Sequence, residues 1–67
     1  MEAFVKRVLD EQKELRIKLE GLTKFLNTGR FYELEIIQQE LLLRQQKAMI
    51  DYDLILRLRL ESLDTKE

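Results

Sequence analysis

The feature that most constrains this chain is an apolar stripe that repeats every three or four residues through its first half. Side chains at this spacing share one face of an α-helix, and such a stripe is buried by packing on another helix. The stripe positions are Met1, Val5, Val8, Gln12, Leu15, Leu19, Leu22 and Leu26, and only Gln12 among them is polar. The stripe predicts one amphipathic helix over about residues 2–27.

The segment FLNTGR predicts the end of this helix. Asn27 and Gly29 tolerate the left-handed backbone angles that are common at helix C-termini, and Thr28 is a residue type that caps a following helix. We expect Phe31 to fold back over the turn. The expected bounds are a turn at 28–33, a second helix at about 34–63 and a frayed tail at 64–67, all in a single unit of residues 1–67.

The second half of the chain carries two apolar faces. Its stretch LILRLRL (54–60) alternates like a β-strand, but it lies in a long segment without turn residues, which favours a helix. One helical face then holds Leu34, Leu41, Leu42, Gln45, Met49, Tyr52, Leu56 and Leu63. The other face holds Ile36, Leu43, Ile50, Leu54 and Leu58. Only one of the two faces can pack on the first helix.

The fold class we predict is all-α, an antiparallel two-helix hairpin that self-associates. Folding about Gly29 pairs Val8 with Tyr52 and Leu15 with Gln45 or its neighbours. A chain of 67 residues buries only about 60 % of its unfolded surface, so it needs support beyond its own core. Since there is no cysteine and no histidine, we expect that support from a second hairpin, in a four-helix bundle or a larger ring. The predicted oligomer interface is the second apolar face, Ile36, Leu43, Ile50, Leu54 and Leu58.

Composition argues against several function classes. The net charge is −1 and 37 % of the residues are charged, which is too balanced for a chain that binds nucleic-acid phosphate. We expect no membrane span, because no apolar run is long enough, and no signal peptide, because the first residues include acids. Without histidine, cysteine or a phosphate-binding loop, we expect no enzyme, no metal and no cofactor.

Two groups of residues are candidates for ligand binding. Arg7, Tyr52 and Arg59 flank the helix contact, where arginines suit phosphates and a tyrosine ring can stack on a nucleobase. Arg30 and Tyr32 in the segment NTGRFY form the second group, near a helix start that could hold a phosphate. The competing interpretation is structural for both groups, since charges flanking a helix contact usually set register and partner choice.

The chain resembles a family of small, uncharacterised bacteriophage and prophage helical-hairpin proteins with relatives in crAss-like phages. The resemblance lies in FVKRVLDEQKELRIKLEGLTKFL, a short turn, and QQELLLRQQKAMIDYDLILRLRL. The matching positions are Phe4, Arg7, Val8, Glu11, Leu15, Lys18, Leu22, Phe25, Leu41, Leu42, Gln45, Met49, Tyr52, Leu56 and Arg59. The resemblance implies a phage accessory protein that acts in the host bacterial cytoplasm, with no known catalytic residues.

The functional hypothesis is therefore a counter-defence protein that acts stoichiometrically. In its leading form the protein sequesters a small immune signalling nucleotide at sites between hairpins, with Arg7, Tyr52 and Arg59 as ligand-binding residues. Two alternatives stay open: an inhibitor that binds a host defence protein directly, and a structural or assembly protein with no ligand.

Overall fold

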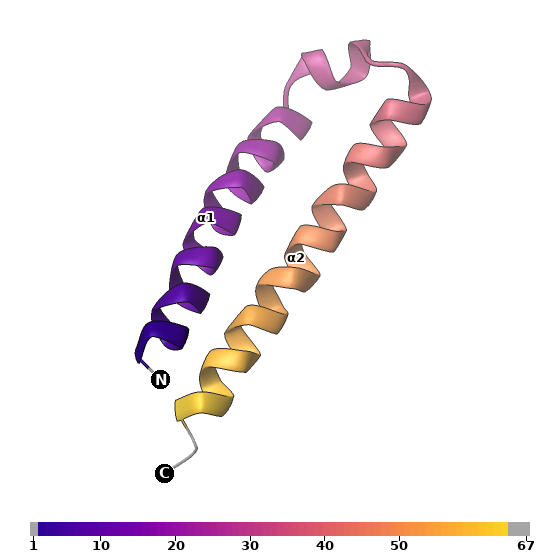
Figure 1. Cartoon of the computed structure of the whole chain (residues 1–67). Helices are drawn as coiled ribbons and strands as arrows, with labels where there is room; N and C mark the ends of the chain where they lie inside the picture. Colours follow the sequence, from indigo (N-terminus) through magenta and orange to yellow (C-terminus); the bar gives the residue numbers. More distant parts are fainter. Residues whose placement is uncertain (1, 65–67) are drawn as a thin grey trace.

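The structure, a computed structural model, describes residues 2–64 as two long antiparallel α-helices joined by a short 3₁₀ helix (Figure 1). Helix α1 spans Glu2–Leu26, the 3₁₀ helix η1 spans Gly29–Glu33, and α2 spans Ile36–Asp64. The rod measures 51 × 15 × 14 Å. The start of α1 and the end of α2 lie at the same end of the rod, which we call the open end (Figure 1). The prediction of an all-α chain with two helices is confirmed.

Helix α1 does not end on the left-handed backbone that we expected at Asn27 and Gly29. Within residues 2–64 no backbone φ angle is positive. Side chains instead satisfy the last carbonyls of α1: Asn27 Nδ2 donates to the carbonyl of Thr23 at 3.0 Å, and the Thr28 hydroxyl donates to that of Phe25 at 2.7 Å. Thr28 therefore caps the end of α1 and makes no side-chain bond to η1. Because these polar side chains do the capping, the turn needs no left-handed residue.

The connection between the helices is longer and more ordered than a simple turn. Phe31 is buried and meets Phe25 edge to face, with ring centroids 6.4 Å apart. The Gln39 side-chain amide donates to the carbonyl of Leu34 at 2.8 Å and to that of Tyr32 at 3.4 Å. These contacts place the first turn of α2 against η1, and α2 begins at Ile36.

The pairing of the two helices differs from the expected one by about one turn. We expected Val8 opposite Tyr52, but Val8 packs in a cluster with Leu15 and Leu56, against which Met49 also packs. The physical reason is the position of the connection: residues 27–35 join the helices, so the chain reverses near Phe31 rather than at Gly29. Moving the centre of reversal by two residues moves every facing partner on α2 by four.

The core of the single hairpin is small. Its buried apolar cluster holds Val8, Leu15 and Leu56, whose exposed fractions are 2 %, 8 % and 0 %. Gln12 lies in the same stripe and is also buried, and its Nε2 has no hydrogen-bond acceptor within the described residues. The single chain therefore buries a polar group without a partner, which costs stability.

A second apolar face of α2 stays uncovered, on the side away from α1. Leu56 is fully buried against α1, and residues two positions away on a helix point about 160–200° from it. The exposed fractions along this face are 75 % for Ile36, 50 % for Leu43 and Ile50, 41 % for Leu54 and 47 % for Leu58. These five residues are the predicted oligomer interface, and the single hairpin leaves all of them available.

Candidate ligand-binding site

The two sides of the helix contact have different chemistry. On one side polar side chains join the helices: Arg16 Nε donates to Asp53 Oδ1 at 3.0 Å, and Gln46 Nε2 donates to Thr23 Oγ1 at 3.1 Å. We call this side the bridged flank. Asp53 pairs with Arg16 because the two helices bring these side chains together, and Arg57 lies 3.9 Å from Glu61.

The opposite side, which we call the groove flank, is formed by two series with a spacing of seven residues. Residues seven apart lie nearly above one another on a helix. The series are Phe4, Glu11 and Lys18 on α1, and Gln45, Tyr52 and Arg59 on α2. They meet at the open end, where Arg59 lies over Phe4, so the spacing places Glu11 across from Tyr52. Within the described residues, Glu11, Lys18 and Tyr52 form no hydrogen bond or ion pair. None of these three side chains therefore connects the two helices through a polar contact.

The groove flank opens into a shallow groove at the open end of the rod. The groove has a volume of about 440 Å³ and a mostly apolar lining. The lining residues are Phe4, Ile55, Leu58, Arg59, Ser62 and Leu63. The guanidinium carbon of Arg59 lies 5.4 Å from the centroid of the Phe4 ring, which is a cation–π contact. The groove therefore combines an aromatic face, aliphatic walls and one cation.

The arginines of the chain divide into two groups by their partners. Arg16, Arg44 and Arg57 lie in ion pairs with acidic side chains. Across the described residues the other three form no ion pair, and they are Arg7, Arg30 and Arg59. These are the three arginines that the sequence analysis chose as ligand-binding candidates. An arginine without an internal carboxylate partner keeps its fork of donors for an external anion.

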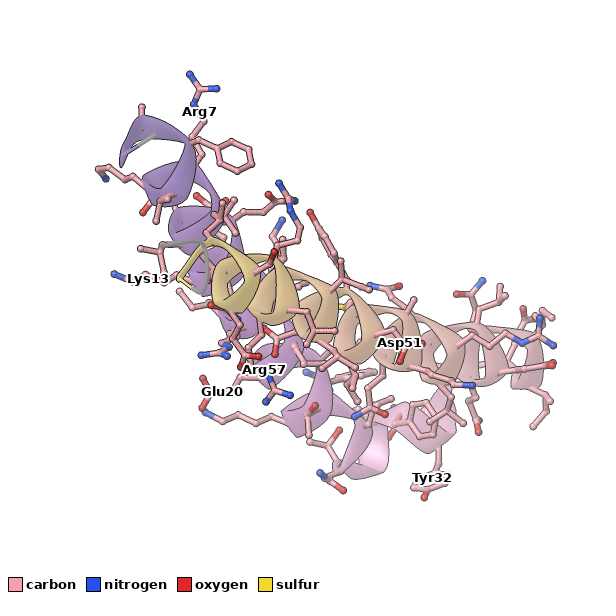
Figure 2. All side chains as sticks on the ribbon, turned by 90° about the horizontal axis from the view of Figure 1, so that it is seen from below. Arg7, Lys13, Glu20, Tyr32, Asp51 and Arg57 are labelled. Atoms are coloured by element: carbon pink, nitrogen blue, oxygen red, sulfur yellow. The ribbon has the colours of Figure 1, made fainter. Side chains whose placement is uncertain are left out.

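The structure does not bring Arg7, Tyr52 and Arg59 into one contact. Arg59 and Tyr52 share the groove flank. Arg7 follows Phe4 by one turn, but its guanidinium extends outward from α1, away from α2 (Figure 2). Arg7 is thus not among the residues that line the groove, although it lies one turn after Phe4 on α1.

The second candidate group lies at the opposite end of the rod. Tyr32 extends into solvent there and is 72 % exposed (Figure 2). Its ring meets Phe31 edge to face at 5.2 Å between centroids. Arg30 lies beside it in η1. The carbonyls of Tyr32 and Leu34 accept from the Gln39 amide, and the turn presents one aromatic ring and one cation in Tyr32 and Arg30.

The groove itself is not apparent from the sequence. Phe4, Ile55, Ser62 and Leu63 line it, yet none was a site candidate. One signal was available: Phe4 begins the series with a spacing of seven that runs beside the apolar stripe. The predicted register was wrong by about one turn. It did not place Arg59 next to the Phe4 ring, so the contact between these two residues was not predicted.

Two further observations limit the chemistry of the described part of the chain. No group of three or more Asp and Glu side chains there is arranged to hold a metal ion. Neither long helix has a stretch apolar enough to cross a bilayer.

Comparisons with known proteins give a family and one relative. Residues 2–62 match the model of the family described as Sequestin. The chain is 38 % identical over 52 residues to the "Uncharacterized 7.5 kDa protein in denB-rIIB intergenic region" of Enterobacteria phage T4, covering 78 % of this chain and 81 % of the phage protein. No solved structure matches the chain. The predicted resemblance to small phage proteins is confirmed, and relatives in crAss-like phages stay a prediction.

Proposed function

The chain belongs to the Sequestin family of small phage proteins, and from this premise we propose that it sequesters a small immune signalling nucleotide in the cytoplasm of the infected host. It acts stoichiometrically and without catalysis, as a counter-defence protein. The family name supports a role in sequestering. The choice of a nucleotide rests on the chemistry of the groove flank.

The observation that carries this proposal is the set of arginines without internal partners. Arg59 lies at an apolar groove with an aromatic face, and Arg7 follows Phe4 by one turn of α1. Tyr52 is on the same flank one heptad away and is partly exposed. A nucleotide has an anionic phosphate for an arginine and a planar base for an aromatic ring, so both halves of the ligand find a counterpart here. The groove volume of about 440 Å³ lies within the range of small-molecule sites.

Self-association completes the proposed site. A single hairpin presents the groove as an open surface, and ligand sites normally bury most of their ligand. Leu58 lines the groove and also belongs to the exposed face of α2. A second hairpin on that face would extend the groove wall and enclose the nucleotide between subunits.

The test is direct binding of nucleotides to the purified protein. We expect cyclic di-AMP or cyclic di-GMP to bind in isothermal titration calorimetry and to be recovered intact after heat denaturation, because sequestration leaves the ligand chemically unchanged. Arg59→Ala should weaken binding by about 1.5–3 kcal/mol, the usual contribution of a hydrogen bond to a charged group.

The matched control for this test is Arg57→Ala. It removes the same charge two residues away, from an arginine that is paired with Glu61, and should leave affinity nearly unchanged. Equal loss in the Arg57 and Arg59 variants would show that only overall charge matters. Cleaved nucleotide in the recovered fraction would contradict sequestration.

The runner-up function is direct inhibition of a host defence protein through the tip of the rod. Tyr32 and Ile36 favour it, because they are the most exposed large apolar residues described, at 72 % and 75 %, and exposed aromatic anchors often carry protein binding. If Tyr32→Ala abolishes protection of a phage on a defended host while nucleotide binding is unchanged, this second function is supported. An assembly protein without a ligand is the third possibility and predicts that neither variant affects protection.

A further inference from the structure

One contact in the groove joins an arginine to an aromatic ring instead of to a carboxylate. The Arg59 guanidinium lies 5.4 Å from the centroid of the Phe4 ring, although α2 carries acidic side chains with which other arginines pair. Arg44 pairs with Glu40, and Arg57 pairs with Glu61. Arg59 is thus a planar cation that covers an aromatic face and is held there by a contact that is weak at exposed sites. Phe4 itself is 43 % exposed, so its ring becomes available once Arg59 moves.

We propose that Phe4 is the base-stacking residue of this groove and that Arg59 leaves the Phe4 ring when a nucleotide enters. The base takes the place of the guanidinium over the ring, and the guanidinium turns to the phosphate of the same ligand. This inference rests on the proposed function, since it assumes that a nucleotide is the ligand. It adds Phe4 as the residue that stacks on the base. It also adds the movement of Arg59 from the ring to the phosphate, which couples base binding to phosphate binding.

The chemistry of the two planar groups supports the exchange. A guanidinium and a nucleobase both lie flat on an aromatic ring, and stacking on such a ring tolerates different bases. The side chains around the ring are aliphatic, from Ile55, Leu58 and Leu63, which suits the base more than the charged guanidinium. The phosphate then offers Arg59 two parallel hydrogen bonds in place of the cation–π contact. The charge of Arg59 becomes paired only in the complex.

The free chain offers a unique reporter for this exchange, because it contains no tryptophan. Phe4→Trp keeps a stacking ring and introduces a single tryptophan at the proposed position, which can be excited selectively over Tyr32 and Tyr52. Phe4→Leu keeps an apolar side chain and removes the ring. Tyr32→Leu removes a ring from the far end of the rod and is the matched control. Circular dichroism and native mass spectrometry verify that each variant keeps the helicity and assembly of the unchanged protein.

The probe is cyclic di-AMP, with cyclic di-GMP as the second base type. We expect Phe4→Leu to weaken binding about 5- to 150-fold, the loss of one base–aromatic stack, and Tyr32→Leu to bind like the unchanged protein. Phe4→Trp should bind and lose fluorescence on saturation. Arg59→Ala should bind more weakly, with an affinity that depends less on salt because one phosphate contact is gone. If Arg59 only covered Phe4, its removal would instead tighten binding.

The outcomes separate this inference from the proposed function. If the unchanged protein binds neither probe, the proposed function fails, and this inference fails with it. If the unchanged protein binds a probe, but Phe4→Leu binds equally well and the Phe4→Trp signal does not change, only the inference is overturned. A loss in Tyr32→Leu equal to that in Phe4→Leu would also overturn it, by placing the base away from the groove.

Discussion

The buried amide of Gln12 gives the sharpest test of how the hairpin is held together. Gln12 is 7 % exposed and lies in the stripe between Val8 and Leu15, and its Nε2 has no acceptor within the described residues. Gln12→Met replaces this amide by a thioether of similar length, which fills the space without a donor that needs a partner. The structure therefore predicts that a single substitution in the core makes the protein more stable.

The size of the gain follows from the missing hydrogen bond. A buried donor without a partner costs about 1–3 kcal/mol, so the free energy of unfolding should rise by about that amount. For a domain of this size, each kcal/mol moves Tm by roughly 4–8 °C. The assay is urea denaturation followed by far-UV circular dichroism. Both proteins are compared at the same protein concentration, because assembly makes apparent stability concentration-dependent.

Gln45→Met is the control, since Gln45 is the exposed glutamine of the groove flank. Its substitution should change stability by no more than about 0.5 kcal/mol, as exposed positions usually do. A Gln12→Met protein that is less stable than the unchanged one would refute the reasoning. It would mean that the amide of Gln12 finds an acceptor, either a water molecule or a group of another copy of the chain.

Three further predictions concern assembly, the bridged flank and α1. Leu54→Glu lies at a position 41 % exposed on the uncovered face of α2. It should give a monomer in analytical ultracentrifugation and lower helicity in circular dichroism, whereas an unchanged assembly would exclude this face as the oligomer interface. Asp53→Asn removes the ion pair with Arg16 and should cost less than about 1 kcal/mol, a difference that shrinks in high salt. Gly21→Ala, where an added Cβ meets nothing within 4 Å, should raise Tm through helix propensity of up to about 1 kcal/mol, and a loss of stability there would reveal a close contact between copies.

The sequence was sufficient to predict the helices because each carries its own periodic signal. Stripe residues such as Val8 and Leu15 report a helix whatever they pack against. The pairing of the helices was not predictable to better than a turn, because it depends on how many residues the connection takes. Thr28 and Asn27 bond back to α1, and η1 adds one more short helix. None of these features has a sequence pattern as strong as a heptad repeat.

The sequence provided residue types for a candidate site, and the structure provided their arrangement. Arg59 and Tyr52 share a flank because they are seven residues apart on one helix, which sequence reveals directly. Phe4 lies on the other helix, so its contact with Arg59 depends on how the two helices are aligned. An alignment that is wrong by four residues does not predict that contact. Whether an arginine is already paired also depends on register, as Arg16 and Asp53 show. Contacts within one helix were therefore accessible from sequence, and contacts between helices were not.

The measurement that tests the central claim most directly is native mass spectrometry of the protein purified without denaturation from bacteria whose nucleotide-based defence is active. Sequestration predicts a closed assembly that carries extra mass on the order of a few hundred daltons per site, the mass of a small nucleotide, and loses it in Arg59→Ala but not in Arg57→Ala. A ligand-free assembly would contradict nucleotide sequestration. A monomer would contradict both the assembly and the site between hairpins.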